Sequence, residues 1–257
     1  MQFDDSSGAR VPTMHQDFFP PDIVVLTGAG ISKESGIDTF RDEDGLWTRV
    51  DLEEVATIDA WHRDRKKVLD FYNDTRKMFR VAHIVPNAAH EALARLERKY
   101  EGEVTVVTQN IDTLHEQAGS RRVLHMHGRD GEIRCMTCGT VTESDDDLGL
   151  DSVCPHCKAV GELRPNIVWF GEMPMHMDEI HAVLERCGLF LSIGTSGEVY
   201  PAAGFVMHVR RHNRRAHAVE LNLEPTGNRT LFHQHIYGPA TLTVPPYVER
   251  VLANGWK

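Results

Sequence analysis

The segment Ile23-Val24-Val25-Leu26-Thr27, followed directly by Gly28-Ala29-Gly30, decides the fold of this chain. An apolar, β-branched run that ends in Gly-x-Gly is typical of a buried strand that enters a tight turn. In such a turn the missing side chains let backbone N–H groups approach a diphosphate. The segment therefore predicts a nucleotide-binding strand and turn, although an ordinary tight turn gives the same pattern.

Three later apolar runs are similar to the first one. They cover residues 104–108, 189–193 and 216–221, and helix-like sequence follows each of them. Strands that alternate with helices predict the α/β class, with a doubly wound, Rossmann-like parallel sheet. Such sheets bind ligands beyond the carboxyl ends of their strands. We therefore expect the functional side chains directly after these runs.

The composition limits the possible partners. The chain has 257 residues, a net charge of −10 and an isoelectric point near 5.8. An acidic balance argues against direct nucleic-acid binding, which needs a basic face; it suits a lysine-rich peptide partner, with plain solubility as the alternative. No apolar run approaches the roughly 20 residues that span a bilayer, and the N-terminal segment lacks the apolar core of an export signal. We expect a cytoplasmic monomer without membrane contact, in which residues 1–19 form a loose arm.

The cysteines form a second strong pattern. Two C-x2-C pairs, Cys135/Cys138 and Cys154/Cys157, are separated by fifteen residues. This spacing fits a four-thiolate zinc site, with thiol redox chemistry as the weaker alternative. Four protein ligands leave no open position on the metal, so we expect the zinc to be structural. We expect the remaining Cys187 to be a core residue.

Polar residues that could carry chemistry follow residues 104–108. Gln109, Asn110 and Asp112 come first, and His127 follows with a glycine after it. An amide and a carboxylate two residues apart can hold hydroxyl and amide groups. A histidine at a neighbouring strand end is a candidate general base, because its ordinary pKa lies near 6.5. We expect the nearby His115 and His125 to have structural roles.

Four segments of the chain carry a family resemblance: residues 28–41, 108–112, 127–128 and 164–172. They resemble the nucleotide loop, the T-Q-N-x-D and H-G motifs, and the R-P-x-[IV]-V-x-F-G-E segment of the sirtuins, the NAD-consuming protein-lysine deacylases. The resemblance extends over residues 23–246. One departure separates the chain from NAD dehydrogenases, because Lys33 stands where their third glycine would fall.

The resemblance implies a reaction and roles for individual residues. His127 would deprotonate the NAD ribose, while Asn110 and Asp112 position the nicotinamide ribose and the carboxamide. The acyl oxygen of a modified lysine would displace nicotinamide from C1′, and the acyl group would pass to the ribose to give O-acyl-ADP-ribose. The implied NAD contacts are Gly28, Ala29, Gly30, Ser32, Glu34, Phe40, Arg41, Gln109, Asn110, Asp112, Gly194, Thr195, Ser196 and Asn222. The implied contacts to the acylated protein are Val168, Phe170, Gly171, Glu172, Glu198, Val199 and Tyr200.

Three further residues bear on the acyl group. Sirtuins that remove acidic acyl chains carry a small Ala and a Tyr-x-x-Arg motif, which Ala56 and Tyr72 match here. The arginine position is Thr75, and Arg76 comes one residue later. About 100° of helix rotation separates these two positions, and threonine cannot grip a carboxylate in bidentate fashion. We therefore predict deacetylation, with a preference for succinyl or malonyl groups as the alternative.

The predicted organisation has four parts. An NAD-binding domain covers residues 20–45, 83–132 and 161–250, a helical subdomain covers 46–82, the zinc ribbon covers 133–160, and the arm covers 1–19. Other interpretations of the chain are an NAD dehydrogenase, a protein mono-ADP-ribosyltransferase and a non-catalytic acetyl-lysine binding module. We expect the histidine-rich segments 208–217 and 233–235 to be solvated surface, with weak, adventitious metal binding as an alternative.

Overall fold

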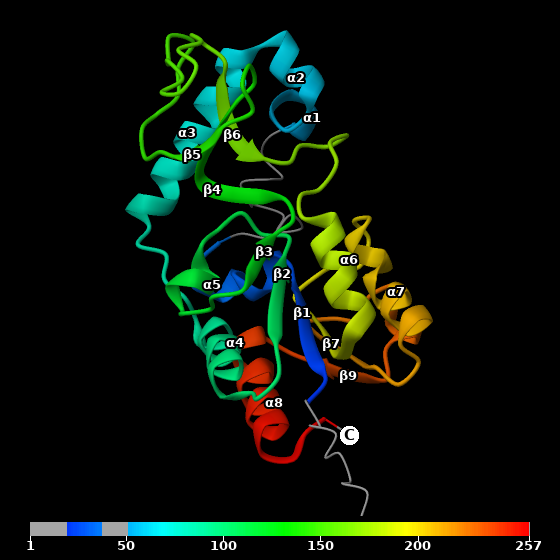
Figure 1. The fold of residues 1–257 in the computed structure, drawn as a ribbon. Helices are drawn as coiled ribbons and strands as arrows, with labels where there is room; N and C mark the ends of the chain where they lie inside the picture. The colour runs from blue at the N-terminus through cyan, green and yellow to red at the C-terminus, as the bar shows by residue number, and fades with distance from the viewer. Residues whose placement is uncertain (1–19, 38–50, 257) are drawn as a thin grey trace, which may run out of the picture.

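The computed structural model describes residues 20–37 and 51–256, which form a larger and a smaller lobe (Figure 1). In the described part of the chain, the larger lobe contains a six-stranded parallel sheet of order β3-β2-β1-β7-β8-β9. Its strands are β1 (Asp22–Thr27), β2 (Val104–Thr108), β3 (Val123–His125), β7 (Cys187–Ile193), β8 (His217–Asn222) and β9 (Gln234–Tyr237). The predicted doubly wound α/β class is thereby confirmed.

Two layers of helices cover this sheet because its central strands are apolar on both faces. Ile23 and Val25 of β1 pack with helices α4 (Ala88–Lys99) and α8 (Ala240–Asn254). Val24 and Leu26 of the same strand pack with α6 (Met177–Arg186) and α7 (Phe205–His212). Figure 1 shows the two helix pairs on opposite sides of the sheet. The strand alternation therefore divides the core into two layers.

Helix α4 begins directly after Asn87. Asn87 caps it, because its side chain accepts a hydrogen bond from the N–H of Ala89 at 3.0 Å. The side chain of His90 reaches back to the backbone N–H of Asn87 and closes a capping box. The apolar face of α4 then packs on the strands of the sheet.

In the smaller lobe, at the top of Figure 1, the described residues form an antiparallel sheet of order β5-β4-β6 and three helices. The strands are β4 (Gly128–Cys135), β5 (Val141–Glu143) and β6 (Leu163–Ile167), and the helices are α1 (Leu52–Val55), α2 (Ile58–Arg63) and α3 (Arg65–Val81). Trp61, Val68 and Trp169 are almost fully buried between them. The sheet extends beyond the ribbon boundaries predicted at 133 and 160, because β4 and β6 pair along most of their length.

Strand β9 differs from the sequence expectation. β9 includes residues 234 and 235, which the sequence analysis assigned to solvated surface. It is an edge strand of only four residues with alternating exposure, so its apolar signal is weak. β3 has three residues and lies at the opposite edge of the sheet. The short helix α5 (Leu114–Gln117) precedes it in the chain. Among residues 20–37 and 51–256, no helix has the length and apolar character that a membrane crossing requires.

Candidate functional site

The loops after β1 and β7 touch through their backbones at the carboxyl edge of the large sheet. The N–H of Gly28 donates to the carbonyl of Ile193 at 3.1 Å, and the N–H of Gly30 donates to that of Gly194 at 2.8 Å. A Cβ atom on Gly30 would lie 2.7 Å from the Cα of Gly194. These glycines are therefore required for loop packing, and two of the N–H groups predicted to approach a diphosphate already bind protein carbonyls.

A buried network connects the loop after β1 with the loop after β2. The side-chain amide of Asn110 donates to the carbonyl of Gly28 at 3.2 Å and to the hydroxyl of Ser32 at 3.0 Å. Ser32 in turn donates to a carboxylate oxygen of Asp112 at 2.9 Å, and the N–H of Leu114 donates to the other oxygen at 3.1 Å. Burial raises the pKa of Asp112, while these two hydrogen bonds oppose the rise.

The network leaves acceptor capacity at the crevice. Both amide hydrogens of Asn110 are donated to the protein, so its Oδ1 remains an acceptor. Asn110 and Asp112 are each 9% exposed and follow β2 at the carboxyl edge of the sheet, where doubly wound sheets bind their ligands. The structure thus brings Ser32 together with Asn110 and Asp112; the family resemblance implies all three as NAD contacts.

One ring nitrogen of His127 is hydrogen-bonded to the protein backbone. Its Nδ1 is 3.0 Å from the carbonyl oxygen of Gln109, and because a carbonyl only accepts, Nδ1 carries the proton. The N–H of Gln109 donates to the carbonyl of Thr27 at 2.9 Å, which anchors that peptide to β1. Burial lowers the pKa of His127, and the Gln109 contact opposes the shift. The ring is therefore neutral at pH 7, with Nε2 as its proton acceptor.

The two neighbouring histidines have different environments. His125 contacts the carbonyl of Asn110 at 3.1 Å and the carboxylate of Glu116 at 2.7 Å. His115 is fully buried, where its Nε2 meets the hydroxyl of Thr27 at 3.0 Å, and burial holds its pKa well below the usual 6.5. Both rings are held in place by the protein, as expected for structural histidines.

Other residues predicted to contact NAD bind the protein itself. Both carboxylate oxygens of Glu34 accept hydrogen bonds from Thr241 near the start of α8, at 2.9 and 2.6 Å. The amide of Asn222 donates to the carbonyl of Thr195 at 2.7 Å and links the ends of β8 and β7. Glu34 therefore holds the loop after β1 against α8. The predicted contacts Phe40 and Arg41 lie outside the described residues.

The segment after β6 runs past His127 toward the smaller lobe. The N–H of Val168 donates to the carbonyl of His127 at 2.8 Å, and the N–H of Phe170 donates to that of Ala56 at 2.9 Å. The Phe170 side chain is 56% exposed. Val199 and Tyr200, which were predicted to bind the substrate backbone, are also exposed on the loop after β7. These exposed side chains fit a peptide-binding surface.

Glu172 is held inside the protein by a cluster that the sequence analysis missed. Arg164 grips its two carboxylate oxygens at 2.8 and 3.0 Å, and the N–H of Trp169 donates to it at 2.8 Å. The guanidinium also lies 3.2 Å from the centre of the Trp169 ring. Glu172 therefore shapes the turn around Gly171. The signal for this cluster was an arginine within an apolar strand, since a buried charge needs a partner.

The residues predicted to select the acyl group also make internal contacts. The Tyr72 hydroxyl accepts a hydrogen bond from the indole N–H of Trp169 at 3.0 Å, and burial raises its pKa above the ordinary value of 10. Arg76 is 3% exposed; it lies 3.3 Å from the carboxylate of Asp130 and donates to the carbonyl of Asp146 at 3.0 Å. Thr75 is buried, and its hydroxyl donates to the carbonyl of Phe71.

The four ribbon cysteines converge as the spacing predicts. The Sγ atoms of Cys135 and Cys157 are 3.6 Å apart, and those of Cys138 and Cys154 are 3.9 Å apart. A tetrahedral zinc with bonds near 2.3 Å requires sulfur pairs about 3.8 Å apart. The donor set therefore fits a structural zinc, which would hold the two turns of the ribbon together and take no part in the reaction. Cys187 is buried in the larger lobe, as expected.

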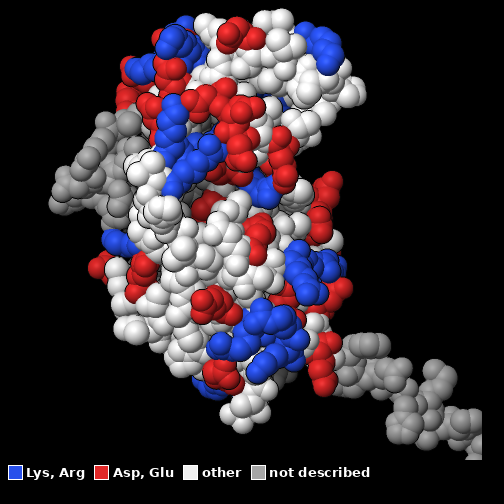
Figure 2. Space-filling model, turned by 90° about the vertical axis from the view of Figure 1, so that its left-hand side faces the viewer, with Lys and Arg blue, Asp and Glu red and all other residues white. Residues whose placement is uncertain are grey.

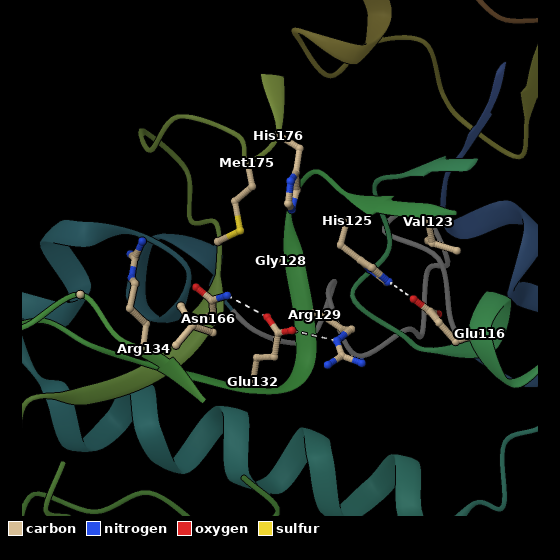
Figure 3. Close-up of a pocket in the computed structure, with 12 residues that line it drawn as sticks. Glu116, Val123, His125, Gly128, Arg129, Glu132, Arg134, Asn166, Met175 and His176 are labelled. Carbon is tan, nitrogen blue, oxygen red and sulfur yellow. Dashed lines mark hydrogen bonds and ion pairs between the residues drawn. The ribbon is translucent and has the colours of Figure 1, made fainter. Parts of the chain in front are cut away.

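A cavity of about 650 Å³ lies beside the crevice (Figure 3). Its lining includes His125 and Gly128, which flank the candidate base, but not the base itself. Figure 3 shows Gly128 at its centre, the His125–Glu116 pair on one side and Asn166 on the other. The Ser32, Asn110 and Asp112 network is absent from the lining, so this cavity is not the nucleotide crevice.

The fold and the crevice define the class of the protein. A doubly wound sheet, polar groups beyond its strand ends and a neutral histidine with a proton-accepting nitrogen are the parts of a dinucleotide-dependent enzyme with a general base. Comparison with known proteins gives the family. Residues 28–201 match the family model described as "Sir2 family". The chain belongs to the Sir2 family.

Relatives and solved structures agree with this assignment. The chain is 50% identical to an "NAD-dependent protein deacylase" of Vibrio vulnificus, covering 90% of this chain and 94% of that one. It is 51% identical to the "NAD-dependent protein deacylase SIR2rp3" of Trypanosoma brucei brucei, with the same coverage. A solved "Sir2 homolog-NAD complex" matches with a TM-score of 0.79 and 36% identity, over 90% of this chain and 91% of that chain. The predicted sirtuin family, NAD dependence and deacylase class are thereby confirmed.

Proposed function

We propose that the chain removes acetyl groups from protein lysine side chains in preference to succinyl or malonyl groups. The observation that carries the proposal is the placement of Arg76. Its guanidinium faces Asp130 and the ribbon carbonyls, while Thr75 occupies the position one helical turn from Tyr72. A neutral threonine offers an acidic acyl chain no charged partner, and burying an unpaired carboxylate is costly.

The proposed chemistry assigns a role to each part of the crevice. His127 Nε2 takes a proton from a ribose hydroxyl of NAD, and the Gln109 carbonyl keeps the ring in the required tautomer. Asn110 Oδ1 and the Asp112 carboxylate accept hydrogen bonds from the nicotinamide ribose and carboxamide. The acyl oxygen would form a bond to C1′ as the bond to nicotinamide breaks. The ribose hydroxyl deprotonated by His127 would then attack the acyl carbon, and addition of water would break the bond to the lysine nitrogen, which gives the free amine and O-acyl-ADP-ribose.

The acylated segment would lie between the exposed loops after β6 and β7. A solved "Sir2-p53 peptide-NAD+" structure matches this chain with a TM-score of 0.69 and 31% identity, over 91% of this chain and 92% of that chain. By that likeness we propose that an extended peptide pairs with the backbone near Gly171 and near Glu198 as an added strand. The remaining predicted NAD contacts, the domain boundaries, the monomeric state and the cytoplasmic location stay predictions from the sequence.

Parallel assays test the proposed preference. Nicotinamide release would be measured with peptides that differ only in an acetyl-, succinyl- or malonyl-lysine. We expect kcat/KM for the acetyl peptide to exceed the other two by about 10-fold or more, the value of one charge-assisted hydrogen bond. Faster removal of succinyl or malonyl would overturn the proposal. Transfer of ADP-ribose to the peptide, followed by mass spectrometry, would reveal an ADP-ribosyltransferase instead.

A further inference from the structure

Helices α6 and α7 lie side by side on one face of the large sheet (Figure 1). Three side chains from these helices converge: Glu185 from α6, and His208 and His212 from α7. We propose that these three residues form a second metal site, for a transition-metal dication such as Zn²⁺, Ni²⁺ or Cu²⁺. The site lies in the larger lobe and shares no residue with the cysteine ribbon or with the crevice.

The distances are close to those of a bound ion. His208 Nε2 lies 3.6 Å from Glu185 Oε1, and His212 Nε2 lies 3.8 Å from the same oxygen. All three ligand atoms lie within 4.8 Å of one another. Tetrahedral bonds of 2.0–2.2 Å place ligand atoms about 3.3–3.6 Å apart. Small rotations of exposed side chains therefore bring all three onto one ion.

The histidine rings are oriented as metal ligands. His212 and His208 are four residues apart on α7, so they share one face of the helix. His212 Nδ1 donates to the carbonyl of His208 at 2.9 Å, which leaves the lone pair of Nε2 toward Glu185. Such a second hydrogen bond is the usual support of a metal-binding imidazole.

His208 carries an independent sign of an unfilled site. Its Nε2 is buried and has no hydrogen-bond partner among the described residues. The ring is stacked between His212 and His181, with centroids 4.1 and 4.9 Å away. A buried ring nitrogen that faces a carboxylate from another helix is a ligand position, and an ion there would satisfy it.

The donor set selects the class of ion. Two imidazoles and one carboxylate suit Zn²⁺, Ni²⁺ and Cu²⁺, whereas Mg²⁺ and Ca²⁺ prefer oxygen ligands only. Three protein ligands leave positions for water, because Glu185 and His212 are partly exposed. An ion that bridges α6 and α7 would stabilise the helix layer on this face of the sheet, since it binds only the folded pair.

Calorimetric titration tests the site on the full chain with its ribbon already loaded with zinc. We expect Zn²⁺ or Ni²⁺ to bind with one equivalent, and the melting midpoint to rise by about 5–10 °C at a free ion concentration near 100 times Kd. Mg²⁺ at the same concentration should do neither. In His212→Ala and Glu185→Gln, ion affinity should fall by about 10-fold or more, while deacylase activity without added metal is unchanged.

His62→Ala is the matched control, because His62 is exposed at the end of α2 in the other lobe. It should bind the ion like the parent protein. Equal ion binding by the parent and the His212→Ala variant would overturn the proposal, as would binding only at millimolar concentration. If His212→Ala loses structure, Glu185→Gln decides instead, because it keeps the side-chain volume and removes only the carboxylate ligand; unchanged ion binding by Glu185→Gln would overturn the proposal.

Discussion

The crevice of the larger lobe and the polar cluster of the smaller lobe both bury polar side chains, but they use them differently. In the crevice, Asn110 and Asp112 keep acceptor capacity. In the smaller lobe, Arg164 is 0% exposed and its guanidinium binds Glu172 and a backbone carbonyl. The crevice residues thus keep an acceptor atom free, whereas Arg164 and Glu172 of the smaller lobe satisfy one another.

The surface of the smaller lobe carries many charged side chains of both signs. Figure 2 shows acidic and basic side chains close together over the upper part of the molecule, above a hollow in that face. Ion pairs join α3 to the loop between β5 and β6, such as Arg80 with Asp145 and Lys77 with Asp147. The charges of the smaller lobe therefore join its own parts, and they are screened at the surface.

Removing the ribbon zinc should have the largest effect on stability, and it should unfold the smaller lobe while the larger lobe stays folded. Structural zinc contributes on the order of 10 kcal/mol to folding in small domains. We expect chelation to remove hydrogen-exchange protection from β4 and β6 while β1 and β7 keep theirs. Deacylase activity should then disappear, because the segment after β6 forms one wall of the site. Full activity of protein shown to be free of metal would contradict this prediction.

Replacing the base should abolish the crevice chemistry without disturbing either lobe. We expect His127→Ala to lower kcat about 10²–10⁴-fold, the usual contribution of general base catalysis. His125→Gln is the comparison, and it should cost far less because His125 only bridges Asn110 and Glu116. Equal losses would contradict the assignment. Since burial lowers the pKa of His127, the acid limb of the parent's kcat/KM profile should lie below pH 6.5.

The buried pair His90 and His115 should make the larger lobe sensitive to acid. Burial lowers the pKa of His90 to about 4 and holds that of His115 well below 6.5. The unfolded chain binds more protons below pH 6.5, so stability should fall as the pH drops from there toward the folded pKa. The slope is about 1.4 kcal/mol per pH unit for each histidine.

Denaturant unfolding between pH 7.5 and 4.5 measures this slope. His90→Gln keeps a side chain able to close the capping box and removes one titration. The variant should therefore lose stability less steeply than the parent on acidification. Equal slopes of the free energy of unfolding against pH for the two proteins would show that the titration of His90 does not contribute to the acid sensitivity.

Ser32→Ala should produce a smaller loss confined to the crevice. It removes one partner each from Asn110 and Asp112, at a cost of about 1–3 kcal/mol for unsatisfied buried groups. We expect kcat/KM for NAD to fall by about 10-fold or more, and the melting midpoint to fall by about 2–4 °C for each kcal/mol that is lost. Ser120→Ala is the control, since its buried hydroxyl has no partner among the described residues. Equal kcat/KM for NAD in the two variants would show that the Ser32 network does not contribute to NAD binding.

The sequence predicted more of the crevice than of the contacts that support it. The reason is the number of residues that separate the contacting side chains along the chain. The strand-and-glycine run at 23–30 and the polar residues after β2 are local patterns, as is the cysteine spacing. The Arg76–Asp130 pair and the Glu34 contact with Thr241 join residues far apart, so no local pattern encodes them. The roles of Gly28 and Gly30 in loop packing also depend on Gly194, more than 160 positions later.

The most direct test of the account is the ratio of kcat/KM for acetyl- and succinyl-lysine peptides in the parent and in Thr75→Arg. Thr75 lies three residues after Tyr72, and both are buried on the same side of α3. The account predicts an acetyl preference in the parent and a gain of about 10-fold or more in succinyl turnover in the variant. A parent that already prefers succinyl, together with a variant that gains nothing, would contradict it.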